Sequence, residues 1–160
     1  MKLSRLAPLF LALVSSLLFL TGCETVPSAV QTARLAMANE IANEPPGDYY
    51  IGRRFYKEDY KFWGYVRSPG QPWTAAKLVM LNEQKKLAPD RAINKFGSDN
   101  NYEYKLIGNF SGETVYEPAS NGFYPEFVLK DYTLQKISPA PIFRNPSDTD
   151  PARRVIAQPY

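Results

Sequence analysis

The residues with the most distinctive chemistry alternate along one short segment of the chain. Residues 60–67 read Tyr-Lys-Phe-Trp-Gly-Tyr-Val-Arg, which is the period-two pattern of a β-strand. One face of this strand would carry Tyr60, Phe62, Gly64 and Val66 toward the core. The other face would carry Lys61, Trp63, Tyr65 and Arg67. Because aromatic rings interleaved with cations stack on sugars and hold anionic groups, the pattern predicts an outward patch that binds a glycan or a partner protein.

The same four residues have a structural interpretation. Phe, Trp and Tyr make up 14% of the chain, and aromatic side chains are efficient fillers of a small β core. An N-terminal helix or a C-terminal segment lying over the strand would bury Trp63 and Tyr65. The outward patch also depends on register, since a slip of one residue exchanges the two faces.

Three carboxylates could in principle act as an acid and a base. Glu113, Glu117 and Glu126 lie in a turn-rich stretch, and two carboxylates across a pocket can hydrolyse a glycosidic bond. Nothing in the sequence pairs them, and no motif specifies a nucleophile, a base or an oxyanion site. We therefore expect a non-enzymatic binding or structural module, with a small glycan-acting hydrolase as the alternative.

Composition excludes several classes of site. The chain has no His and a single Cys, which removes Ser-His-Asp and Cys-His catalysis, His-ligated zinc and an intrachain disulfide. No metal and no cofactor are expected. Setting aside Lys2 and Arg5 lowers the formal net charge from +3 to +1, so bulk charge gives no case for binding nucleic acid.

The N-terminus has the layout of a secretory signal. A positive start is followed by an apolar run, residues 6–20, and then by Thr21, Gly22 and Cys23. This arrangement is typical of a signal peptide, here residues 1–22, and the run is short for a permanent membrane-spanning helix.

The ending Leu20-Thr21-Gly22-Cys23 resembles the lipobox of bacterial lipoproteins. The resemblance implies cleavage before Cys23 and acylation of its thiol, which would anchor the mature protein to a membrane. Proteobacterial lipoproteins that stay in the inner membrane tend to have Asp after this Cys. Glu24 departs from that signal, so we expect a lipid-anchored protein of the cell envelope at the outer membrane, facing the periplasm.

The remaining elements are predicted from the periodicity of apolar residues and from the Pro and Gly residues that interrupt it. An Ala-rich helix is predicted over residues 28–43, within a lipidated tether of residues 23–47 that ends at a Pro-Pro-Gly boundary. Five strands are predicted over residues 49–56, 60–67, 73–82, 102–110 and 127–135, with Glu103, Lys105 and Asn109 on the outward face of the fourth. A short helix beginning at Pro89 separates strands three and four. The β domain would span residues 48–143, and residues 144–160 would form a flexible tail.

The order of these elements predicts an all-β fold. Three strands, a short helix and two strands match the order of the oligonucleotide/oligosaccharide-binding barrel, in which strands two and three form the usual ligand face. We therefore expect a small five-stranded antiparallel barrel. An open meander or sandwich is the alternative.

Overall fold

The computed structural model describes residues 28–60 and 63–160. The predicted signal peptide, Cys23 and Lys61 lie outside this range. The first element is the helix α2 (Ala29–Ala42), as predicted. The amide of Gln31 donates to Ser28 Oγ at 3.2 Å and so caps its start. None of the helices described is long and apolar enough to cross a membrane.

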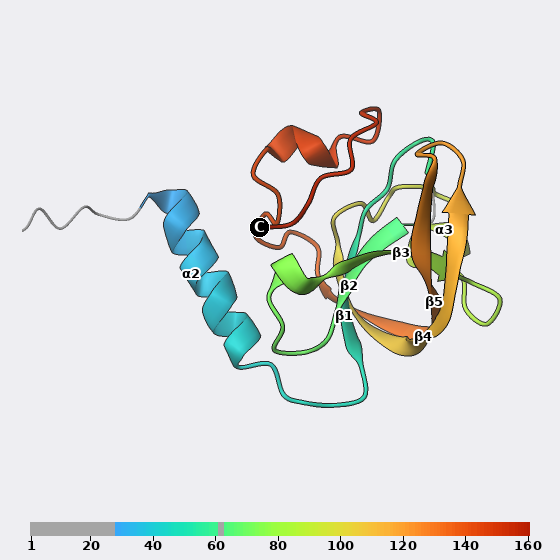
Figure 1. Cartoon of the computed structure of the whole chain (residues 1–160). Coiled ribbons are helices and arrows are strands. Elements are labelled where there is room, and N and C mark those ends of the chain that lie inside the picture. Colours follow the sequence, from blue (N-terminus) through green and yellow to red (C-terminus); the bar gives the residue numbers. More distant parts are fainter. Residues whose placement is uncertain (1–27, 61–62) are drawn as a thin grey trace, which may run out of the picture. The chain divides into compact units, whose positions relative to one another are not determined.

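Five strands close into a barrel (Figure 1). They are β1 (Tyr50–Arg54), β2 (Trp63–Arg67), β3 (Lys77–Asn82), β4 (Glu103–Glu117) and β5 (Gly122–Lys136). Around the barrel the order is β1-β2-β3-β5-β4, and β4 pairs with β1. Three short helices complete the fold: η1 (Trp73–Ala75), α3 (Pro89–Ala92) and η2 (Pro146–Thr149). The predicted five-stranded barrel and the short helix between strands three and four are confirmed.

The prediction of a purely antiparallel sheet is wrong. Strands β3 and β5 run parallel, with Met80 opposite Glu126 and Asn82 opposite Val128, whereas every other pairing is antiparallel. The reason is geometric. Strand directions cannot alternate around a closed ring with an odd number of members, so a closed five-stranded barrel must contain a parallel pair.

The hairpin of β4 and β5 is longer than predicted, with 15 residues in each strand. The register shifts between Ile107 and Gly108 and again between Phe110 and Thr114, so bulges carry the strands past residues that look like breakers. Gly112, inside the second irregularity, has φ of +91°. Gly108 allows a close approach, because a Cβ there would lie 2.3 Å from the carbonyl oxygen of Val128.

The interior of the barrel is an apolar core with one buried charge cluster. The core consists of Val66, Val79, Tyr104, Leu106, Phe127 and Leu129. Arg54, also buried, pairs with Asp90 at 2.8 Å and with Asp99 at 3.2 Å. The cavity that remains is about 20 Å³, which is room for one water molecule. The interior of the barrel is therefore filled by its own side chains.

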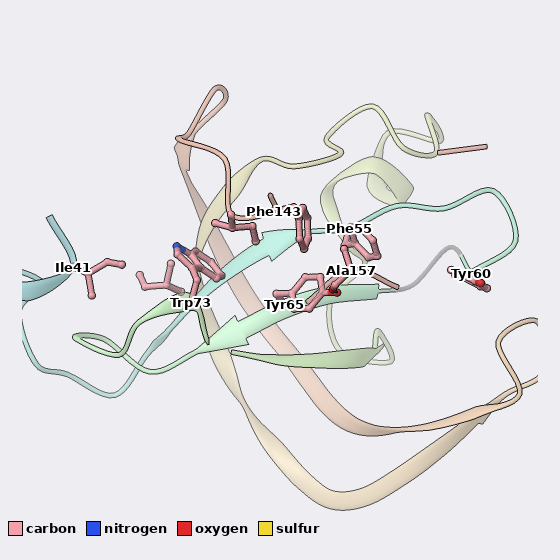
Figure 2. Packing of buried hydrophobic residues seen from close by; sticks show 9 residues of the cluster. Ile41, Phe55, Tyr60, Tyr65, Trp73, Phe143 and Ala157 are labelled. Carbon is pink, nitrogen blue, oxygen red and sulfur yellow. The ribbon is translucent and has the colours of Figure 1, made fainter. Parts of the chain in front are cut away.

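A second core lies on the outer side of β1 and β2. Its buried members are Ile41, Ile51, Phe55, Tyr60, Tyr65, Trp73, Ile142, Phe143 and Ala157. Figure 2 shows Phe55, Tyr65, Trp73 and Phe143 along these two strands, with Tyr60 farther out, before the start of β2. The last three members come from the chain after β5, so the C-terminal segment supplies one wall of this core.

The C-terminal segment, residues 139–160, differs from the flexible tail expected from residue 144 onward. The Lys57 ammonium donates to the carbonyl oxygens of Asp148 and Asp150, both at 2.6 Å. The side-chain amide of Asn100 donates to the Thr149 carbonyl at 2.8 Å. Side chains of residues before the segment thus satisfy three of its carbonyl groups, and its own short turns, including η2, satisfy others. The segment is therefore held in place without a strand ladder or a long helix.

Candidate ligand-binding pockets

The predicted patch on β2 is only partly within the described residues, and the part that is described is buried. The predicted parity is correct, since Val66 faces the interior of the barrel and Tyr65 faces the other side. Tyr65 and Arg67 are, however, 1% and 3% exposed, so the prediction that they lie on an outward surface is wrong. Lys61 and the side chain of Trp63 lie outside the described residues.

Tyr65 is covered by the C-terminal segment, which is the alternative in which a C-terminal segment lies over the strand. Its hydroxyl donates to the carbonyl oxygen of Ala157. Its ring meets Phe55 and Phe143 in edge-on contacts, with centroids 5.2 and 5.4 Å apart. Burial raises the pKa of the Tyr65 hydroxyl, which keeps it a neutral donor. Tyr65 is thus a member of the second core.

Arg67 takes part in a buried cluster around Trp73. The guanidinium of Arg67 donates to both oxygens of Glu44, at 2.7 and 2.6 Å, and lies 4.6 Å from the Trp73 ring centroid. Arg53 lies 4.9 Å from the same centroid and pairs with Glu103 at 2.7 Å. The cluster joins the chain after α2, β1 and β4. Each buried guanidinium is paired with a carboxylate, because an unpaired buried charge is strongly destabilising.

The three candidate acid-base carboxylates occupy different settings. Glu117 accepts the amides of Ala119 and Ser120 at 3.0 and 2.7 Å, so it closes the turn between β4 and β5. Glu126 accepts the side-chain amide of Asn82 at 2.9 Å and so links β5 to β3. Glu113 is exposed. Glu117 and Glu126 therefore each hold a structural hydrogen bond.

Within residues 28–60 and 63–160, no group of three or more His, Cys, Asp or Glu side chains could hold a metal ion.

A polar pocket of about 430 Å³ opens beside the first strand. Its polar lining includes Glu40, Glu44, Glu103, Lys105, Gln135 and Lys136, and Tyr49 supplies an aromatic wall. The Lys105 ammonium lies 4.2 Å from the centroid of the Tyr49 ring. Lys136 bonds to Glu40 and lies 3.9 Å from Glu103. The pocket therefore presents carboxylate acceptors and ammonium and amide donors side by side.

Sequence reasoning did not identify this pocket. Its residues come from α2, from the linker before β1 and from β1, β4 and β5, and several of these parts lie far apart in the sequence. Each residue is also of a common surface type. The available signal was the outward position of Glu103 and Lys105 on the fourth strand.

A second pocket, of about 390 Å³, is mostly apolar. It lies between the C-terminal half of α2, represented by Met37 and Ile41, and the loop that leads to Trp73. The Arg34 guanidinium lies 3.7 Å from the centroid of the Tyr160 ring at this site. Residues of α2 thus form part of the lining of both larger pockets. The cavity inside the barrel, by contrast, has space for only one water molecule.

The volumes of the two larger pockets are in the usual range for small-molecule sites, about 300–1,000 Å³. The polar pocket has the richer hydrogen-bonding chemistry and is the better candidate for a ligand. Comparisons of the chain with protein-family models, with curated proteins and with solved structures gave no match.

Proposed function

We propose that this chain is a lipid-anchored protein of the bacterial cell envelope whose barrel binds a glycan without transforming it. Acyl chains on Cys23 hold it at the outer membrane, facing the periplasm. The lipobox-like ending at Cys23 supports this anchorage. Two or three acyl chains make it firm, because each buried methylene contributes ~0.8 kcal/mol and one chain alone is marginal.

The barrel is, in this proposal, of the oligonucleotide/oligosaccharide-binding kind. The strand order β1-β2-β3-β5-β4 and the position of α3 between β3 and β4 support it. The usual ligand face of such a barrel, on β2 and β3, is partly occupied by the C-terminal segment, which buries Tyr65. We therefore expect the ligand to bind at another surface of the barrel.

The polar pocket is the observation on which the glycan proposal rests. Sugar hydroxyls both donate and accept hydrogen bonds, so they need carboxylate acceptors and cationic or amide donors at one site. Glu40, Lys105 and Gln135 supply these groups around a pocket of about 430 Å³. The Tyr49 ring adds an apolar wall for the C–H face of a sugar.

The pocket is tested with variants of exposed residues. We expect Lys105→Ala to weaken binding of soluble glycan fragments prepared from the bacterial envelope about tenfold or more, since a hydrogen bond to a charged group contributes about 1.5–3 kcal/mol. Gln135→Ala should weaken it less, since a hydrogen bond between neutral groups contributes about 0.5–1.5 kcal/mol. Lys130→Ala, an exposed residue of β5 outside the pocket lining, is the matched control. Isothermal titration calorimetry measures the affinities. Equal binding by the Lys105 variant and the wild type would exclude this pocket, and fragments shortened by the protein would favour the hydrolase.

The anchor is tested separately by replacing the thiol. Cys23→Ser should move the protein out of the membrane fraction, because the only thiol of the chain is lost. Fractionation and intact mass measure the result. A variant that stays in the membrane pellet with no loss of acyl mass would contradict acylation at Cys23.

A further inference from the structure

The first part of the connection between β3 and β4, residues 83–97, exposes large apolar side chains close together in sequence. Leu87, Ile93 and Phe96 are 46%, 61% and 50% exposed. The helix α3 lies between Leu87 and Ile93, and both Ala88, which precedes the helix, and Asp90 within it are buried. The apolar groups therefore project from a segment whose inward positions are already filled.

The acidic residues of this segment are turned inward. Asp90 is fully buried and accepts hydrogen bonds from Arg54 at 2.8 Å and from the Gly97 amide at 2.9 Å. Glu83 pairs with Arg91 at 2.6 Å and accepts the Ala88 amide at 3.1 Å. These contacts fix the segment at both ends. They also remove its negative charge from the surface.

The lysines of the segment are turned outward. Lys85, Lys86 and Lys95 are exposed. Lys86 lies 3.4 Å from Asp131 of β5, a pair in which both side chains are largely exposed and therefore weakly coupled. Lys130, next to that Asp, is exposed as well. Charge sorting thus gives a surface of protruding apolar side chains among ammonium groups.

We propose that this surface, made of Lys85, Lys86, Leu87, Ile93, Lys95 and Phe96, contacts the headgroup region of an anionic phospholipid membrane. The ammonium groups are complementary to lipid phosphates, and each Lys near an anionic surface strengthens the contact about fivefold. Apolar side chains among cations are the composition that enters the membrane interface. A fluid bilayer accepts separate projecting side chains, whereas a protein partner would need a matching hollow for each.

The contact is measured by placing a fluorophore at the surface. The full chain with Phe96→Trp is mixed with vesicles of phosphatidylglycerol and phosphatidylcholine whose acyl chains carry bromine, which quenches Trp fluorescence. Phe123→Trp is the matched control, because Phe123 is 70% exposed on the β4–β5 hairpin, far from this segment in sequence. The wild-type signal of Trp63 and Trp73 is subtracted.

We expect strong quenching of the Phe96→Trp variant and weak quenching of the Phe123→Trp variant. Replacing all three lysines by Gln, or raising the salt to 1 M, should lower the first signal to the level of the control. Vesicles of phosphatidylcholine alone should give little quenching in either variant. The comparison between two positions in one protein holds whether or not Cys23 is acylated.

Equal quenching of the two variants, or quenching that is the same without phosphatidylglycerol, would overturn the proposal. Absence of quenching at both positions would also overturn it and would point to an acidic protein as the partner. None of these results bears on the Lys105 pocket or on Cys23, so a failure here is distinct from a failure of the proposed function.

Discussion

Replacing Phe143 by Ala is the sharpest test of how the C-terminal segment is held. Phe143 is buried in the second core. Its ring centroid lies 5.3 Å from that of Phe55 and 5.4 Å from that of Tyr65. Figure 2 labels the three rings. The next residue, Arg144, is exposed. The two neighbours therefore form a matched pair for substitution.

The expected loss follows from the packing. Truncating a buried Phe to Ala costs about 3–5 kcal/mol, and the two aromatic contacts, each worth about 0.5–1.5 kcal/mol, place Phe143→Ala in the upper part of that range. A domain of this size loses about 4 °C of Tm for each kcal/mol. We therefore expect a drop of about 15–20 °C.

Thermal unfolding followed by circular dichroism measures this drop. The control Arg144→Ala should change the Tm by about 2 °C or less, since exposed substitutions stay within about 0.5 kcal/mol. If Phe143→Ala unfolds at the temperature of the control, the C-terminal segment does not belong to the cooperative unit. The assignment of Tyr65 to a second core would then fail with it.

Three further substitutions probe other parts of the molecule. Gly108→Ala should lower the Tm by about 4–12 °C, because its Cβ would lie 2.3 Å from the Val128 carbonyl oxygen and overpacking costs about 1–3 kcal/mol. An unchanged Tm would refute that close approach. Tyr65→Phe should cost about 1–3 kcal/mol by leaving a buried carbonyl without its donor, and urea unfolding measures it. Burial alone would raise the pKa of Glu44, but hydrogen bonds from Arg67 and a backbone amide together lower it below its ordinary value of 4.5. The stability that Glu44 contributes is therefore present above about pH 4.5 and is lost as the pH falls below it. Glu44→Gln should therefore make the Tm fall less steeply at acid pH than it does in the wild type. Curves of Tm against pH that run parallel in the two proteins would contradict the pairing of Glu44 with Arg67.

Local pattern predicted several features of the fold correctly. The alternation of residues 60–67 placed Val66 inside the barrel and Tyr65 outside it, because side-chain parity along a strand depends on backbone geometry alone. Residue type and position also predict Ser28 as the cap of α2. They predict Pro89 as the first residue of α3 in the same way.

Features that depend on distant contacts could not be read from local pattern. Gly112 and Pro125 look like strand breakers, yet β4 and β5 continue past them, since a bulge absorbs one and the other lies within a long hairpin. The C-terminal segment is aperiodic, so nothing local shows that Lys57 and Tyr65 hold it. Burial of Arg67 depends on Glu44, which lies 23 residues earlier in the chain. The prediction that Tyr65 and Arg67 are exposed is wrong because the residues that cover them lie far away in the sequence.

Burial of β1 and β2 on both faces also has a consequence for how the barrel opens. The four residues of β1 after Tyr50 are buried, and so are the four residues of β2 after Trp63. Their amides can meet solvent only when the inner core and the outer core separate together, so they should exchange with deuterium at the rate of global unfolding. The end of the β4–β5 hairpin is bounded by exposed side chains such as Phe123, and its amides should exchange through small local openings. The barrel thus combines a slowly exchanging pair of strands with a hairpin end that opens independently of them.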